Sequence, residues 1–194
     1  DVGAEVIGDR DVHRGHPEVV GGLLEGLPED AYAGATALPE AEIIPQAERR
    51  IEATGADFRV GGTKAFYVPS RDFIRVPPQP AFFEQVNYYR TCFHELGHWT
   101  GHESRLARDL SHPFGSKPYA REELVAEMAS AFVCASLSIA PTVRHTDYIG
   151  SWLEVLREDN RAIFRAASQA SKATDFILAF REAGKSSDSS MVAA

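Results

Sequence analysis

The chain has 194 residues, 44% of them hydrophobic and 25% charged, which is the composition of an ordinary globular domain. Its formal net charge is −8 at pH 7, so no overall positive field exists to attract nucleic acid or an anionic membrane. No apolar run approaches the ~20 residues of a membrane-spanning helix, and two cysteines, Cys92 and Cys134, do not make a secreted disulfide framework. We therefore expect a protein without membrane contact in a reducing compartment.

The first predicted elements follow an N-terminal segment of irregular composition. Residues 1–40 are rich in Gly, Pro, Asp and Glu and show little periodicity, so a loop-like segment is expected there. The stretch IPQAERRIEATG, residues 44–55, has the spacing of an amphipathic helix that ends at Gly55. We expect one domain over residues 41–184, followed by a disordered tail over residues 185–194.

A small sheet is predicted after this helix, and a helical body after the sheet. Gly61-Gly62 and a turn around Pro69-Ser70-Arg71 separate three strand-like runs, a spacing that predicts an antiparallel meander. The runs are DFRV at 57–60, KAFYVP at 64–69 and DFIRVP at 72–77. From Phe83 onward the periodicity predicts helices near 83–101, 119–138, 144–157 and 160–183. The expected fold class is α+β, a small antiparallel sheet followed by a mainly helical body.

The first of these later helices contains HELGH at residues 94–98. At about 100° per residue, His94 and His98 lie within about 40° of each other on one helix face. Two imidazoles one turn apart can converge on one metal ion, and Glu95 beside them can reach a water molecule without being a ligand. The alternative is a helix with two half-exposed histidines and no metal. An apolar stripe is predicted on the opposite face: Tyr89, Cys92, Phe93, Leu96 and Trp99.

A third ligand is expected from the next helix, YAREELVAEMASAFVCA at 119–135. Glu123 and Glu127 stand one turn apart on a face with small neighbours, and a buried carboxylate is costly unless it has a partner such as Zn²⁺. We predict that Glu123 is the third ligand and that Glu127 accepts a hydrogen bond from a ligating imidazole. From spacing alone either glutamate could face the metal. The alternative is a solvated charge run in which Glu127 pairs with Arg121 or Lys117.

His102 does not complete a set of three histidines. It lies eight residues from His94, about 12 Å along one helix, so the two side chains cannot bind the same ion while the helix continues. The longer three-histidine motif requires His at position 104, which is Ser104 here. We interpret His102 as a surface residue or a support for the ligands.

Four longer stretches together resemble one known family. They are GGTKAFYVPSRDFIRVPP, YYRTCFHELGHWTGHESRL, YAREELVAEMASAFVCA and YIGSWLEVLREDNRAIFRAASQA, in this order along the chain. This order is similar to the C-terminal zincin-like metallopeptidase domain of ArdC-type antirestriction proteins, a group that includes the plasmid primase TraC and polyvalent proteins. The resemblance covers roughly residues 17–183. The spacing of Glu123 and Glu127 also resembles the gluzincin helix in which the first acid binds zinc.

The resemblance implies a zinc metallopeptidase that hydrolyses peptide bonds with a zinc-activated water. Zn²⁺ would be held by His94, His98 and Glu123, and Glu95 would take the water proton and pass it to the leaving amine. Tyr119, His112 and Arg121 are candidates for the donor to the oxyanion by their nearness along the chain only.

The same resemblance implies a cytoplasmic bacterial protein of a conjugative plasmid or prophage that helps incoming DNA escape restriction. The substrate would be a protein or peptide, for example a host restriction or DNA-processing protein. In this family a domain that binds single-stranded DNA precedes the peptidase. The stretch GLLEGLPED at residues 22–30 resembles the segment just after that domain, so we interpret residues 1–40 as a remnant of the linker and expect this chain to bind single strands weakly. The alternative function is a zinc-braced binding module that inhibits restriction, or assists single-strand binding, without proteolysis.

Overall fold

The computed structural model describes residues 43–82, 84–140, 153, 156–157 and 159–181. Three expectations lie outside these residues: the loop-like segment at 1–40, the tail at 185–194 and most of the helix at 144–157. The helices are α1 (Pro45–Thr54), α2 (Gln85–Trp99), α3 (Lys117–Ser136) and α5 (Ala162–Leu178), and the strands are β1 (Asp57–Val60), β2 (Phe66–Val68) and β3 (Phe73–Val76). Two short 3-10 helices, η3 (Pro69–Arg71) and η4 (Gln79–Ala81), complete the described elements.

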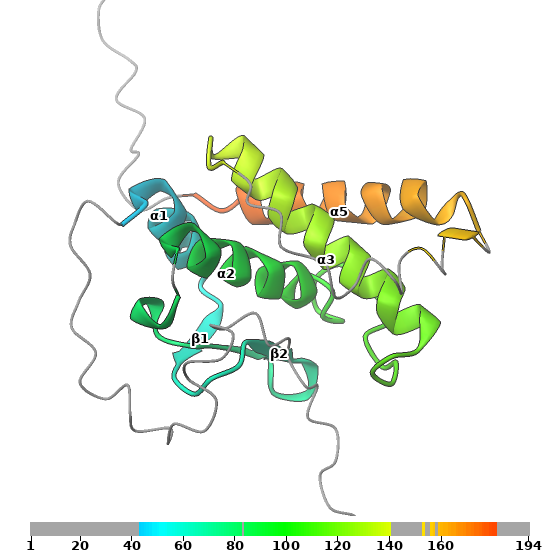
Figure 1. Ribbon diagram of the computed structural model, residues 1–194, viewed down its shortest axis with the longest axis horizontal. Coiled ribbons are helices and arrows are strands. Elements are labelled where there is room, and N and C mark those ends of the chain that lie inside the picture. The colour runs from blue at the N-terminus through cyan, green and yellow to red at the C-terminus, as the bar shows by residue number, and fades with distance from the viewer. Residues whose placement is uncertain (1–42, 83, 141–152, 154–155, 158, 182–194) are drawn as a thin grey trace, which may run out of the picture.

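Helix α2 occupies the centre of the molecule. It lies between the small sheet on one side and the pair α3 and α5 on the other, with α1 at one end (Figure 1). The predicted apolar stripe of α2 is confirmed as core, because its members are buried: Tyr89, Cys92, Phe93, Leu96 and Trp99. Burial of each large apolar side chain contributes about 1.5–3 kcal/mol to stability, so this stripe holds α2 in place.

The sheet is mixed, and the predicted antiparallel meander is wrong in one pairing. The strand order is β1-β3-β2, with β2 antiparallel to β3 but β1 parallel to β3. The physical reason is burial. Strand β3 has the most buried side chains of the three strands, with Ile74 and Val76 fully buried, and the central position of a sheet is the most shielded from water. The edge strand β1 leaves Val60 62% exposed. The predicted turn at Pro69-Ser70-Arg71 is confirmed as η3, which joins β2 to β3.

The helix ends follow local chemistry. Helix α1 has Pro45 at its start and ends at Gly55, whose φ of 64° is the left-handed conformation that glycine adopts without strain. Helix α3 begins after Ser116, whose hydroxyl accepts a hydrogen bond from the backbone N–H of Tyr119 at 3.3 Å. This cap stabilises the start of α3.

Helices α2 and α3 cross at a close contact. A Cβ atom placed on Gly97 would lie 3.0 Å from the Cα of Ala126, a separation at which one of the two helices would have to move. Gly97, inside HELGH, therefore lets the backbones approach. The contact places the two histidines of α2 opposite the glutamate-rich turns of α3.

Candidate metal centre

The two histidines of HELGH and one glutamate of α3 form a compact cluster. Nε2 of His94 and Nε2 of His98 are 3.1 Å apart, and they lie 3.4 Å and 3.5 Å, respectively, from the two carboxylate oxygens of Glu123. His94 and Glu123 are buried, with 7% and 3% of their surfaces exposed. Among the described residues, these three form the group of His, Cys, Asp and Glu side chains that is compact enough to hold an ion.

The geometry fits a divalent cation. Four donors at about 2.1 Å from a tetrahedral ion lie about 3.4 Å from one another, close to the separations in this cluster. Nδ1 of His94 lies 3.0 Å from Oε1 of Glu127, and Nδ1 of His98 lies 3.2 Å from Oε1 of Glu122. A carboxylate opposite Nδ1 favours a proton on that nitrogen, which leaves both Nε2 lone pairs directed toward Glu123. Three acceptors that converge in this way require positive charge between them.

The electrostatics agree with this interpretation. Burial lowers the pKa of His94, but the carboxylates of Glu127 and Glu123 outweigh it and hold that pKa well above its ordinary value. The pKa of His98 is also lowered by burial, but Glu123 and Glu122 raise it to about 9. The cluster therefore attracts positive charge strongly, and a metal ion would compete with protons for it.

One oxygen of Glu127 lies beside Nδ1 of His94, and its second oxygen is 3.4 Å from the guanidinium of Arg90; its predicted role behind a ligand stays a prediction. Sequence analysis assigned no role to Glu122. Burial raises the pKa of Glu122, but hydrogen bonds with His98 and Arg108 outweigh it and hold that pKa below its usual range. One sequence feature could have identified Glu122. Two ligating histidines need two separate acceptors at their Nδ1 atoms, and the sequence offers one glutamate before Glu123 and one after it.

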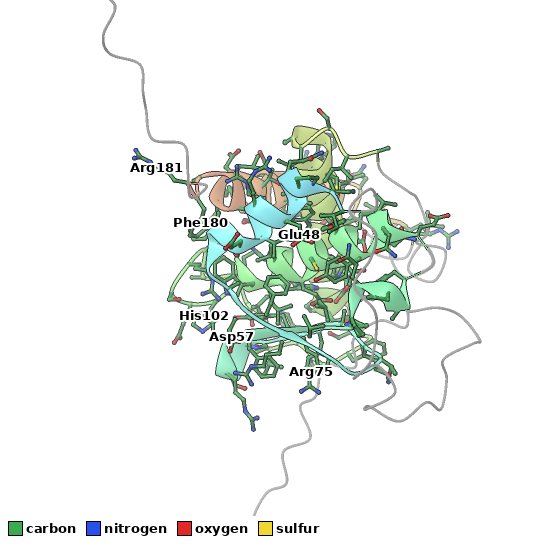
Figure 2. All side chains as sticks on the ribbon, turned by 90° about the vertical axis from the view of Figure 1, so that its left-hand side faces the viewer. Glu48, Asp57, Arg75, His102, Phe180 and Arg181 are labelled. Atoms are coloured by element: carbon green, nitrogen blue, oxygen red, sulfur yellow. The ribbon has the colours of Figure 1, made fainter. Side chains whose placement is uncertain are left out.

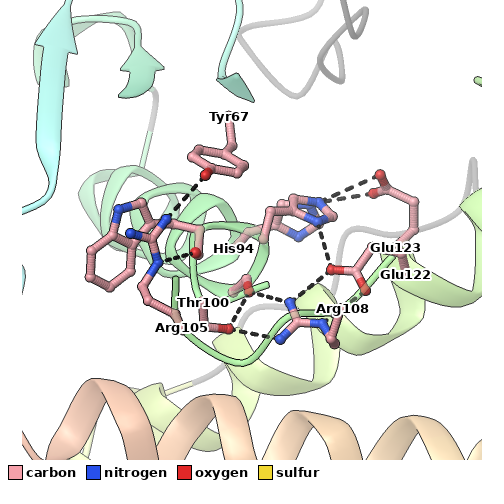
Figure 3. Close-up of polar contacts among 10 residues, drawn as sticks. Tyr67, His94, Thr100, Arg105, Arg108, Glu122 and Glu123 are labelled. Atoms are coloured by element: carbon pink, nitrogen blue, oxygen red, sulfur yellow. Dashed lines mark hydrogen bonds and ion pairs between the residues drawn. The ribbon is translucent and has the colours of Figure 1, made fainter. Parts of the chain in front are cut away.

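A pocket opens onto the cluster from the side of the sheet. His98, Glu123 and Glu95 line its polar end, and Glu95 is buried, with 4% of its surface exposed. The opposite wall is apolar and comes from β2, from the turn after it and from the loop after α2: Phe66, Tyr67, Pro69 and Leu110. Figure 3 shows Tyr67, His94 and Glu123, which come from three different elements around this end of α2. The predicted base and two of the three predicted ligands thus share one pocket.

The remaining predicted residues divide into two groups. Tyr119 and His112 line the pocket, whereas Arg121 is exposed and does not, which leaves the first two as donor candidates. Nδ1 of His102 lies 2.8 Å from the hydroxyl of Ser104, in agreement with its interpretation as a surface residue. Figure 2 shows His102 at the edge of the molecule.

Comparisons with known proteins agree with this fold. Residues 45–169 match the model of a family described as zincin-like metallopeptidase. The chain therefore belongs to the zincin-like metallopeptidase family, and both the predicted resemblance and the α+β zincin-like fold class are confirmed. The described residues include no helix long and apolar enough to span a bilayer.

Relatives and solved structures narrow the comparison. The chain is 50% identical over 141 residues to a DNA primase TraC of Escherichia coli, a match that covers 72% of this chain and 13% of that protein. It is 48% identical over 142 residues to the uncharacterized protein y4eC of Sinorhizobium fredii (strain NBRC 101917 / NGR234), covering 72% and 46%. The chain thus spans less than half the length of these two relatives.

The crystal structure of the antirestriction protein ArdC from plasmid R388, with Mn(II) bound, is similar with a TM-score of 0.64 and 40% identity. The similarity covers 73% of this chain and 57% of ArdC. The metal-free ArdC structure is similar with a TM-score of 0.62 and 42% identity, over 79% and 56% of the two chains. The ligand set and the choice of Zn²⁺ for this chain stay predictions.

Proposed function

We propose that this chain is a metal-dependent peptidase domain of an ArdC-like antirestriction protein. The observation that carries the proposal is Glu95, a buried carboxylate that lines the same pocket as His98 and Glu123. A site that only stabilised the fold would need no carboxylate beside its ligands, whereas hydrolysis needs a base at this place.

His94, His98 and Glu123 would hold the cation, with Glu127 and Glu122 opposite the Nδ1 atoms. Zn²⁺ suits two imidazoles and a carboxylate, and the Mn(II) in the ArdC structure makes Mn²⁺ the second metal to test. When bound, the cation supplies Lewis acidity, which lowers the pKa of a water molecule and polarises a carbonyl oxygen.

The chain's own residues would move the protons and stabilise charge. The carboxylate of Glu95 takes a proton from the attacking water and delivers it to the nitrogen of the leaving amine. Burial raises the pKa of Tyr119, and the nearby Glu123 raises it further, so its phenol stays protonated at neutral pH. A protonated phenol at the pocket wall can donate to a developing oxyanion, and we assign this role to Tyr119 before His112.

The pocket lining favours a peptide over a phosphodiester. Four carboxylates line it, from Glu95, Asp109, Glu122 and Glu123, and no lysine or arginine is among its described lining residues. No cationic side chain among these described residues would bind the phosphates of a nucleic acid, whereas an apolar peptide side chain can lie against Phe66. The description of ArdC as an antirestriction protein supports host restriction proteins as substrates, and the name of the primase TraC supports other DNA-processing proteins.

The cellular setting belongs to the same proposal. The names of the relatives, an antirestriction protein of a plasmid and a DNA primase, support a role in the transfer of DNA between bacteria, in the cytoplasm. Residues 41–184 would be the peptidase domain. Binding of single-stranded DNA is expected of longer family members, and the net charge of −8 supports weak binding by this chain.

A second candidate function is a metal-braced binding module that acts without proteolysis. The names of the relatives favour it, because they describe antirestriction and primase proteins and mention no protease. In this case, the cation would hold α2 and α3 together, and Glu95 would have no essential role.

One pair of variants separates the two functions. Glu95→Gln removes the base and keeps the shape, and Glu103→Gln makes the same change at an exposed position of the same chain segment. With Zn²⁺ or Mn²⁺ present, digestion of a peptide mixture should fall about 10²–10⁴-fold for Glu95→Gln and stay unchanged for Glu103→Gln. Metal affinity should stay within about threefold of wild type in both, since Glu95 is not a predicted ligand. Wild-type cleavage by Glu95→Gln would refute the role of Glu95 as the base, and absence of metal-dependent cleavage by wild type would refute the peptidase proposal. A retained restriction-escape phenotype of Glu95→Gln in cells would support the binding module.

A further inference from the structure

Arg108, in the loop after α2, connects the end of that helix to the metal centre. Its guanidinium donates to both oxygens of Glu122, at 2.8 Å and 3.0 Å, in a two-pronged contact. It also donates to the carbonyl of Gly97 at 2.6 Å and to the hydroxyl of Thr100 at 2.9 Å. Figure 3 shows Arg108 beside Glu122 and Thr100. The Arg108 side chain is 8% exposed and that of Glu122 is 12% exposed, so the contact is largely shielded from water.

Glu122 contacts both Arg108 and a predicted ligand, His98. The carboxylate oxygen that accepts from Arg108 at 2.8 Å, Oε1, also lies 3.2 Å from Nδ1 of His98. The three side chains thus form a series from the loop, through α3, to α2. A buried carboxylate with a fixed cationic partner stays ionised and holds one position, and it can therefore orient the imidazole that donates to it.

From this series we infer that Arg108 is a positioning residue of the metal centre, which sets the metal affinity of His98 by fixing the carboxylate of Glu122. The inference rests on the proposed ligand set. Arginine suits the position because its planar fork matches both carboxylate oxygens at once, whereas a lysine would offer a point charge. With Glu122 held, the ring of His98 keeps its Nε2 lone pair directed at the same point as that of His94.

Arg105 provides a matched control in the same loop. Its guanidinium donates to the carbonyl of Trp99 at 2.6 Å, to the carboxylate of Asp72 and to the hydroxyl of Tyr67 at 3.1 Å. It also lies 3.9 Å above the centre of the Trp99 ring. Arg105 is therefore partnered much as Arg108 is, but its contacts lead to the sheet and not to a histidine.

The test is a double-mutant cycle on metal affinity in the full chain. Arg108→Met, Glu122→Ala and the double variant are titrated by calorimetry with Zn²⁺ alone and with Mn²⁺ alone. Loss of a hydrogen-bonded partner behind a ligand weakens metal binding by about 10–100-fold, and we expect this for Arg108→Met. In the Glu122→Ala background, Arg108→Met should change the affinity by less than about twofold, because the two residues act in series. Arg105→Met should lower the melting temperature but leave the affinity within about twofold of wild type.

A second variant and a spectrum keep the inference testable if Arg108→Met folds poorly. Arg108→Lys retains the charge and loses the fork, and we expect it to lower the affinity by about tenfold and to shift the visible absorption of the Co²⁺-loaded protein. Equal affinities for wild type, Arg108→Lys and Arg108→Met would overturn the inference. So would equal losses from Arg108→Met with and without Glu122.

The outcome also distinguishes this inference from the proposed function. If wild type binds metal, His94→Ala does not, and the Arg108 variants bind like wild type, the ligand set stands and only the role of Arg108 falls. If wild type binds neither metal, both proposals fall together.

Discussion

The two faces of α2 are both buried, but they differ in what burial requires of them. Phe93 and Leu96 are fully buried on the apolar face, and their burial stabilises the fold without specific partners. His94 and Glu95 are nearly as buried on the other face, with 7% and 4% of their surfaces exposed. Burial of polar groups costs free energy unless each is paired, so this face depends on the glutamates of α3 and on positive charge. The apolar face therefore defines the fold, and the polar face defines the chemistry.

If the polar face of α2 binds the metal, the largest expected effect is the loss of metal affinity in His94→Ala. Removal of one of three ligands should lower the affinity for Zn²⁺ or Mn²⁺ by more than about 100-fold, beyond the effect of losing a residue behind a ligand. Calorimetric titration and metal analysis of the purified protein measure this. The matched control is His102→Ala, which removes a histidine whose Nδ1 contacts Ser104 and should leave metal content at wild-type level. Stoichiometric metal in His94→Ala would show that the predicted ligand set is wrong.

Phe93→Ala tests the apolar face in the same helix. Truncation of a fully buried phenylalanine should lower the free energy of unfolding by about 3–5 kcal/mol, because the transfer term and the cavity add. Urea denaturation of the metal-free protein measures it, with Phe164→Ala, at a 74% exposed phenylalanine, as the control that should cost little. In the fraction that remains folded, metal affinity should change by less than about threefold. A large loss of affinity with little loss of stability would contradict the division between the faces.

The helical periodicity of the sequence predicted the helices and the two faces of α2. The helices near 44–55, 83–101, 119–138 and 160–183 are present as α1, α2, α3 and α5, because apolar residues at helical spacing mark buried stripes. The histidines of HELGH were found for the same reason, since both lie on one helix.

What sequence did not predict depends on contacts between elements. The strand order β1-β3-β2 also depends on such contacts: the apolar residues of β3 favour a buried strand, but they do not specify that β1 pairs with β3 in parallel. The crossing of α2 and α3 at Gly97 brings three further side chains to the polar residues of the site: Glu122, Arg108 and Arg90. Their roles could not be predicted without this crossing. Partners of this kind come from three segments of the chain and have no common spacing.

Gly97→Ala should affect both stability and metal binding, with a smaller loss of stability than Phe93→Ala. The added Cβ would lie 3.0 Å from the Cα of Ala126 and 3.3 Å from its Cβ, so the two helices would have to move apart by a few tenths of an ångström. We expect a loss of about 1–3 kcal/mol in unfolding free energy, the usual cost of overpacking. Metal affinity should fall as well, because the histidines move relative to Glu123. Ala131→Ser, at an exposed position of α3, is the control for a substitution on these helices. Unchanged affinity in Gly97→Ala would show that the crossing does not set the ligand geometry.

The smallest effect is expected at Asp72, a polar contact away from the ligands that is partly open to water. Hydrogen bonding by Arg105 lowers the pKa of Asp72, more than partial burial raises it. A carboxyl whose folded pKa is depressed contributes stability above its unfolded pKa of about 3.9, and that stability is lost as pH falls through the folded value. The side chain is 39% exposed, so solvent screening limits the contribution to less than about 1 kcal/mol. The variant Asp72→Asn tests this contribution, and asparagine suits the left-handed backbone at this position, where φ is 49°.

Urea denaturation should show that wild type is slightly more stable than Asp72→Asn at pH 6–7, with the difference shrinking below about pH 4. A difference that grew toward acid pH would mean that the neutral form of Asp72 is the stabilising one, and the ion pair with Arg105 would then have no part in holding the loop after α2 against the sheet.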